Sequence, residues 1–138
     1  MLDQFTRNSF RENPRAFAGD PRAQKLALEA LDAQLDRELG FVERIFLKVP
    51  LAHAEDLALQ ERSVVETEEL TGEIADWQRP FFARGTEQAR KYRDVIARFG
   101  RFPHRNAALG RTSTPEEEAF LVDWKERQAP SAAKDLAK

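Results

Sequence analysis

The feature that most constrains the fold of this chain is a repeated signal for the start of a helix. An N-cap residue followed by proline occurs at Asp20-Pro21 and again at Thr114-Pro115. Proline suits the first helical position because its missing N–H would have no partner there anyway. Glu117 follows Thr114 at the spacing of a capping box. No stretch shows the period-two alternation of β-branched residues that strands require. The chain is therefore predicted to be all-α.

The first two predicted helices cover residues 20–39 and 54–72. In the first, leucines recur at every third or fourth position, and Gly40 supplies the stop. The second starts with acidic residues, which suit the positive end of a helix dipole, and ends at Gly72. The apolar residues expected on the buried sides are Leu28, Leu31, Leu35 and Leu39 in the first helix, and Leu57, Ala58, Val64 and Val65 in the second.

Two further helices complete the prediction. The third runs from about residue 80 to 99, with small residues at Gly85 and Ala89 where a neighbouring helix could approach closely. The fourth begins at the second N-cap and proline pair. We expect antiparallel helices joined by short loops, with residues 1–129 as a single helical domain and residues 130–138 as a flexible tail.

Composition excludes several classes of protein and site. The chain has no Cys, which excludes disulfides, thiolate zinc sites and cysteine nucleophiles. Its two His residues are too few for a site of several imidazoles, and no metal or other cofactor is expected. A net charge of -2 argues against nucleic-acid binding. No apolar run of membrane length and no leader sequence is present, so no membrane partner is expected and the protein is predicted to be cytoplasmic.

Three segments carry a resemblance to a known family. They are "LDQFTRN" at residues 2–8, "VPLAHAED" at residues 49–56 and "ARFGRFPHRNAALGRTSTPEE" at residues 97–117. Together they resemble the signature segments of the bacterial DUF924 family, whose name records that no function was assigned. The resemblance implies a TPR-like α-α superhelical fold and no particular activity. The chain departs from the family at Thr6, where members usually carry Pro, and it lacks the family's helices before the first segment.

The start of the chain suggests self-association. Met1 opens directly on a patterned segment, as if the sequence began in the middle of a helix. Without the family's preceding helices, the apolar residues Leu2, Phe5 and Phe10 would have too little cover in a monomer. A homo-oligomer that buries this face is therefore expected.

The loop after the third helix allows two interpretations. Gly100 suits the left-handed residue that ends a helix, and four arginines follow or flank it without a local acidic residue. Guanidinium groups bind carboxylate and phosphate oxygens, and the next helix N-terminus would add free N–H groups, so the loop could bind an anion. The same side chains could instead satisfy helix carbonyls and pair with acids elsewhere. The candidate ligand-binding residues, in this loop and the first segment, are Asp3, Gln4, Arg7, Asn8, Arg101, Arg105, Asn106 and Arg111.

Three residues are candidates for acid–base catalysis. His53 is expected at or just before a helix N-terminus, and a carboxylate such as Glu55 could orient its ring as a general base. His104, in the arginine-rich loop, is the third candidate. Structural roles explain these residues equally well, since Glu55 could cap the helix and His53 could bond to backbone.

Two classes of function stay open. The preferred one is a non-enzymatic binding module for a protein, a peptide or a small anionic ligand. The alternative is an enzyme with acid–base, hydrolase-like chemistry on an anionic substrate, in a pocket where the three segments converge. Missing helices would leave such a pocket open to water, which a binding groove tolerates better. The charge-rich runs "ETEEL" at residues 66–70 and "KERQ" at residues 125–128 are predicted to be solvated helix faces.

Overall fold

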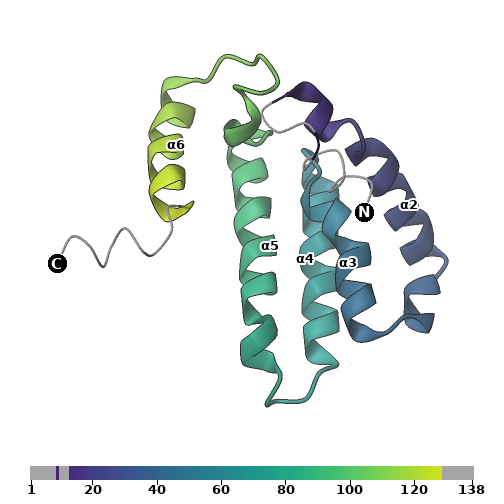
Figure 1. Ribbon diagram of the computed structural model, residues 1–138. Helices are drawn as coiled ribbons and strands as arrows, with labels where there is room; N and C mark the ends of the chain where they lie inside the picture. Colours follow the sequence, from purple (N-terminus) through teal and green to yellow (C-terminus); the bar gives the residue numbers. More distant parts are fainter. Residues whose placement is uncertain (1–8, 10–12, 129–138) are drawn as a thin grey trace. The chain divides into compact units, whose positions relative to one another are not determined.

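The chain folds into helices that group into two compact units. The computed structural model describes residue 9 and residues 13–128, and the units divide after Arg101. Within the described residues there is no strand, so the all-α prediction is confirmed. The first unit contains η1 (Pro14–Phe17), α2 (Asp20–Asp32), η2 (Leu35–Glu38), α3 (Phe41–Ala52), α4 (Leu57–Gly72) and α5 (Arg79–Phe99), and the second contains η3 (Pro103–Arg105) and α6 (Pro115–Gln128) (Figure 1).

In the first unit, helices that follow one another in the chain pack against one another. α2 packs on α3, α3 on α4, and α4 on α5, and Figure 1 shows α3, α4 and α5 side by side. This stacking is compatible with the TPR-like arrangement that the family resemblance implies. The single-domain assignment to residues 1–129 stays a prediction. The tail at 130–138 and the self-association residues Leu2, Phe5 and Phe10 lie outside the described residues.

The apolar core of the first unit lies where α2, α3 and α4 meet. Ala27 and Leu31 from α2 pack against Leu51 from α3, which is fully buried. Leu28, Leu47 and Leu59 surround this cluster and are partly buried. Burying a leucine side chain stabilises a fold by about 1.5–3 kcal/mol. This cluster fixes α2 on the α3–α4 pair and so places the elements that follow it.

The first predicted helix is shorter than the leucine spacing indicates. It ends at Asp32, because Gln34 adopts the left-handed conformation at φ 55° and turns the chain. Leu35 and Leu39 then lie beyond the helix and are 53% and 40% exposed, so their predicted burial is wrong. Gly40 does not stop this helix.

Gly40 instead begins a helix that the sequence analysis missed. Its N–H donates a hydrogen bond of 2.8 Å to Glu43 Oε2, and α3 starts at the next residue. The carboxylate of Glu43 thereby satisfies an N–H group at the helix start that would otherwise have no partner. α3 carries a proline, Pro50, in its last turn.

The second predicted helix begins later in the chain than expected, and a different side of it is buried. α4 starts at Leu57 because Asp56 caps it, with Oδ1 accepting the N–H of Leu59 at 3.0 Å. Of the predicted buried residues, Val64 is buried, whereas Leu57, Ala58 and Val65 are exposed. The side facing the core is partly polar: it contains Gln60, Ser63, Val64 and Leu70.

Gln60 shows why a polar residue occupies that side. Its Nε2 donates to the carbonyl oxygens of Ala52 and Ala54, at 2.8 and 2.7 Å, and the side chain is fully buried. These carbonyls lie at the end of α3, where no further helical N–H group is available to donate to them. The amide therefore joins the end of α3 to α4, which a hydrophobic residue could not do.

The third predicted helix is confirmed as α5. It runs from Arg79 to Phe99, and Gly100 follows in the left-handed conformation at φ 71°, as expected. Ala89 is buried, but Gly85 is exposed and an added Cβ would meet no atom within 4 Å. The predicted close approach of another helix at Gly85 is therefore wrong.

The start of α6 matches the sequence prediction closely. Glu117 Oε2 accepts the N–H of Thr114 at 2.9 Å, and Thr114 Oγ1 accepts the N–H of Glu117 at 3.2 Å. The predicted capping box is confirmed, with Pro115 at the first helical position.

Candidate functional site

The arginine-rich loop of the second unit is held together by a buried asparagine. Asn106 is 1% exposed, and its Nδ2 donates to Ser113 Oγ at 3.0 Å and to Glu117 Oε2 at 3.1 Å. Its Oδ1 accepts Arg111 Nε at 3.0 Å, and Arg111 Nη2 donates to the carbonyl of Phe102 at 3.1 Å. These bonds support the structural interpretation for Asn106 and Arg111, because both side chains already stabilise the turn. A ligand role for either stays a prediction.

Aromatic contacts position the two residues that precede Asn106. The guanidinium carbon of Arg105 lies 4.7 Å from the ring centre of Phe102, and Arg105 is 6% exposed. The imidazole of His104 stacks on Trp124, with ring centres 4.8 Å apart and planes at 4°. Both contacts lie within the second unit. The catalytic role predicted for His104 and the anion-binding role predicted for Arg105 stay predictions.

The other candidates lie in the first unit or outside the described residues. His53 is the C-cap of α3 and Glu55 lies in the connection to α4, so neither belongs to the first turn of α4, where Glu55 was expected. Both are half-buried, as is Arg101. Since each unit is described by itself, the predicted convergence of the three segments stays a prediction. The first-segment candidates Asp3, Gln4, Arg7 and Asn8 lie outside the described residues.

The first unit contains a charged cavity that the sequence analysis did not anticipate. It has a volume of about 640 Å³ and is formed by α2, η2, α3 and α4. Its wall carries five carboxylates and three guanidinium groups. The lining residues are Leu31, Asp32, Gln34, Asp36, Arg37, Arg44, Arg62, Glu66, Glu69 and Glu73.

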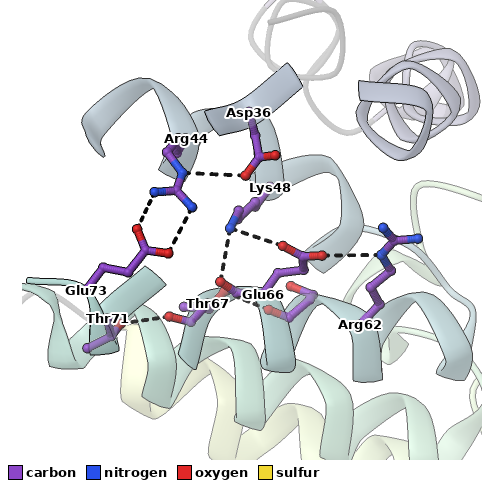
Figure 2. A network of polar contacts seen from close by, with 9 residues as sticks. Asp36, Arg44, Lys48, Arg62, Glu66, Thr67, Thr71 and Glu73 are labelled. Carbon is purple, nitrogen blue, oxygen red and sulfur yellow. Dashed lines mark hydrogen bonds and ion pairs between the residues drawn. The ribbon is translucent and has the colours of Figure 1, made fainter. Parts of the chain in front are cut away.

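Helical spacing brings most of these charges together. Four residues from α4 and its C-cap are separated by four, three and four positions, which places them along one face: Arg62, Glu66, Glu69 and the C-cap Glu73. α3 contributes basic side chains that reach the carboxylates of this face, as Figure 2 shows for Arg44. The seam between the two helices is thus ionic on the side of the cavity.

A buried lysine forms the inner part of this seam. The side chain of Lys48 is 5% exposed, and Nζ lies 3.1 Å from the backbone oxygen of Glu66 and 3.2 Å from its Oε2. The other carboxylate oxygen of Glu66 lies 3.5 Å from Arg62 Nε, and Arg62 Nη1 lies 2.7 Å from Asp32 Oδ1. Side-chain charges therefore alternate from Lys48 through Glu66 and Arg62 to Asp32 (Figure 2 draws the first three).

Arg44 binds one carboxylate with two of its nitrogens and lies near a second. Its Nη1 and Nη2 donate to the two oxygens of Glu73, the latter bond at 3.2 Å. This fork lowers the pKa of Glu73 below its ordinary value, chiefly through the hydrogen bond, and raises the pKa of Arg44. Arg44 Nε lies 3.5 Å from Asp36 Oδ2, an ion pair without hydrogen-bond geometry. Both members of the fork are held in their charged forms.

Three charged groups of the wall keep unused bonding capacity. The side chain of Asp36 is 9% exposed, and within the described chain its one polar contact is the 3.5 Å ion pair with Arg44. Arg37 and Glu69 are exposed at the cavity, and their side chains make no hydrogen bond or ion pair within residues 13–128. A ligand could therefore meet Arg37 and Glu69, which the described chain leaves unpaired, and Asp36, which has one long ion pair.

The prediction that "ETEEL" is only a solvated helix face is wrong for Glu66. The side chain of Glu66 is 18% exposed and pairs with the buried Lys48. A signal for this was present, because the acidic face of α4 matches basic residues four apart at 44 and 48. That match becomes visible only once residues 41–52 are recognised as a helix.

The described residues offer neither a metal site nor a membrane span. No group of three or more His, Asp or Glu residues in this part of the chain could hold a metal ion. None of its helices is both long and apolar enough to cross a membrane.

Comparison with known proteins identifies the family. Residues 1–124 match the family model described as a bacterial protein of unknown function, DUF924. The chain is also similar to a solved structure, titled as a protein of unknown function from Agrobacterium tumefaciens, with 38% identity and a TM-score of 0.72. That match covers 88% of this chain and 63% of the other, so the chain spans less than two thirds of the solved protein. Comparison with curated proteins gives no match. With nearly its whole length matched in sequence, and the helical fold matched in structure, the chain belongs to the DUF924 family.

Proposed function

We propose that this protein is a non-enzymatic binding protein that holds a small charged ligand in the cavity between α2, η2, α3 and α4. The observation that carries the proposal is the volume of this cavity together with the charged groups of its wall that have bonding capacity left. The cavity is partly open to solvent, and its volume of about 640 Å³ lies within the range of small-molecule sites. Asp36, Arg37 and Glu69 face this space with bonding capacity that the described chain leaves unused.

The lining chemistry favours binding over catalysis. Among the described residues, no histidine, serine or threonine lines the cavity, so neither an imidazole base nor a hydroxyl nucleophile from this part of the chain faces it. A carboxylate acting in acid–base catalysis near neutral pH would need a raised pKa, but the pKa of Glu73 is lowered by Arg44. The residues considered for acid–base chemistry, His53, Glu55 and His104, are not among those that line it.

The network around the cavity also supports a preformed site. Arg44 is held by Glu73 and Lys48 by Glu66, so both basic side chains have fixed directions. A ligand that enters such a site loses less binding free energy to ordering of side chains. An anionic ligand at the arginine-rich loop receives less support, because Arg111 and Asn106 are already bonded to each other.

The proposal can be tested by titrating isotope-labelled protein with small probes and following backbone amide shifts by NMR. The panel contains agmatine, succinate, inorganic phosphate and the uncharged 1,4-butanediol. At least one charged probe should shift the amides of Asp36, Arg37 and Glu69 in a saturable way, and butanediol should not. The double variant Arg37→Ala/Glu69→Ala should change the affinity for the responding probe.

A matched control uses exposed residues outside the cavity. Arg84 and Glu61 are exposed, lie on α5 and α4, and make no side-chain hydrogen bond or ion pair within the described chain. Arg84→Ala/Glu61→Ala removes the same charges and should bind the probe as the wild type does. If no charged probe shifts the cavity amides, or if both double variants lose binding equally, the cavity is not a ligand site.

A further inference from the structure

We infer that the ligand of the charged cavity presents a cationic nitrogen, an ammonium or guanidinium group, to the buried carboxylate of Asp36. This inference rests on the proposed binding function and names the chemical class that the same site selects. It differs from the anionic ligand that the arginine-rich loop suggests, because the cavity and that loop have opposite balances of charge.

The charge balance of the wall gives the first argument. Five carboxylates face three guanidinium groups around the cavity. Two of those guanidinium groups are already engaged, Arg44 by both oxygens of Glu73 and Arg62 by Asp32 at 2.7 Å. Asp32, Glu66 and Glu73 are engaged as well, so what the wall still offers is the carboxylates of Asp36 and Glu69 against the single guanidinium of Arg37.

The environment of Asp36 gives the second and stronger argument. Its side chain is 9% exposed, and its one polar contact with a described residue is the long ion pair with Arg44. The buried Nε of Arg44, 3.5 Å away, lacks a hydrogen-bond partner. An ionised carboxylate can accept about four hydrogen bonds, so one long ion pair leaves most of this capacity of Asp36 unused. Asp36 lines the cavity, so donors brought by a ligand would correct this deficit.

The geometry also indicates which kind of cation fits. The carboxylates of the described chain do not form a group that could hold a metal ion. A nitrogen cation does not need several carboxylates around one point, since an ammonium has three N–H donors and a guanidinium has five, and these can bond to separate acceptors. Glu69 adds a second carboxylate at the exposed part of the wall, where the other end of a short dication could lie. A small organic molecule with two cationic nitrogens matches both features.

Isothermal titration calorimetry with agmatine and succinate tests this class directly. Agmatine carries a guanidinium and an ammonium on a short chain, and succinate is an anion of comparable length. Agmatine should bind saturably to the wild type. Asp36→Asn should weaken binding by at least about tenfold, the loss expected for a charge-assisted hydrogen bond. Glu69→Gln should weaken it less, and Glu61→Gln should leave it unchanged.

Each outcome separates the inference from the proposed function. If succinate shifts the cavity amides and agmatine does not, the inference is overturned and the binding function stands. If neither probe nor phosphate binds, both fall. Equal binding of agmatine by wild type and Asp36→Asn also overturns the inference. If Asp36→Asn fails to fold, two measurements replace it: the affinity of Glu69→Gln for agmatine, and the amide shifts at Asp36 and Arg37 of the wild type. An unchanged affinity together with unmoved amides refutes the inference.

Discussion

The pair formed by Lys48 and Glu66 offers a quantitative test of how the seam between α3 and α4 is stabilised. Lys48→Met keeps an unbranched side chain of similar length and removes the charge from a group that is 5% exposed. Glu66→Gln removes the opposite charge and keeps the shape. The double variant Lys48→Met/Glu66→Gln completes a thermodynamic cycle that isolates the interaction between the two side chains.

The expected magnitude follows from the distances. At 3.2 Å between Nζ and Oε2, and with an effective dielectric constant of about 20, the attraction is about 5 kcal/mol. Desolvation of the buried ammonium opposes this by several kcal/mol. Lys48→Met leaves Glu66 with one cationic partner, Arg62 at 3.5 Å. We therefore expect a loss of about 2–3 kcal/mol in the free energy of unfolding, below the roughly 3–5 kcal/mol of a fully orphaned buried charge. The coupling energy of the cycle should be about 1–3 kcal/mol.

The measurement is urea unfolding followed by far-ultraviolet circular dichroism. The midpoint should fall at an unchanged slope, which marks a change of stability rather than of compactness. The matched control is Lys91→Met, because Lys91 and Glu87 form an exposed pair at 2.7 Å on α5. That control should cost no more than about 0.5 kcal/mol. The reasoning is refuted if Lys48→Met costs no more than Lys91→Met, or if the coupling is under about 0.5 kcal/mol.

Three further predictions concern the cap of α6, the acid response and an exposed aromatic. Glu117→Ala removes the acceptor for the Thr114 N–H and the Asn106 amide, so thermal unfolding should show a loss of about 2 kcal/mol; a loss under about 0.5 kcal/mol would contradict the capping role. The pKa of Glu73 is lowered from 4.5 by its guanidinium partner, so its contribution is present above that pH and is lost as the pH falls through the lowered value. Because the side chain is 53% exposed, Glu73→Gln should cost under about 1 kcal/mol at neutral pH and nothing in strong acid, as measured by urea unfolding across pH; a cost that grows as the pH falls would refute this. Phe46 on α3 is 69% exposed, and Phe46→Ser should change stability by no more than about 0.5 kcal/mol in the same urea assay, unless the residue is covered by a partner.

Local signals in the sequence predicted the helices whose ends they mark. The start of α6 was predicted from Thr114 and Glu117, because a capping box is formed by residues three apart. The end of α5 was predicted from Gly100, because glycine adopts φ 71° without the strain of a side chain. These features depend on neighbours in the chain, so no knowledge of the packing was needed.

The break after α2 depended on information that local patterns lack. Gln34 adopts a positive φ, which glycine and asparagine mark more often than glutamine does. The leucine spacing continued through the break to Leu39, so the periodic pattern extended the helix too far. Gly40 was then interpreted as the end of one helix when it begins the next. A glycine between two helices does not itself show to which helix it belongs.

The charged cavity could not be predicted because it depends on the relative position of helices. Lys48 looks like an ordinary helical lysine until α3 packs against α4 and removes it from water. Asp36 lies in a short 3-10 turn that was expected to be part of a helix. By contrast, Asn106 and Arg111 attracted attention in the sequence, and the structure explains both by bonds within their own turn. Residue type alone therefore suggested a ligand site in the arginine-rich loop, whereas the packing of the helices suggests one in the charged cavity.

The ionic seam has a consequence for what the cavity can do. An apolar seam between two helices is often at least as stable as one with buried ion pairs, so stability alone does not explain Lys48 at this position. The pairs do fix directions: Lys48 holds the carboxylate of Glu66, and Arg44 holds both oxygens of Glu73. With those two carboxylates occupied, Asp36 and Glu69 are the acceptors left for an incoming group. On our proposal, the ion pairs of the seam neutralise most of the wall, and the ligand is selected by the charges that stay unpaired or, as at Asp36, have only one long ion pair.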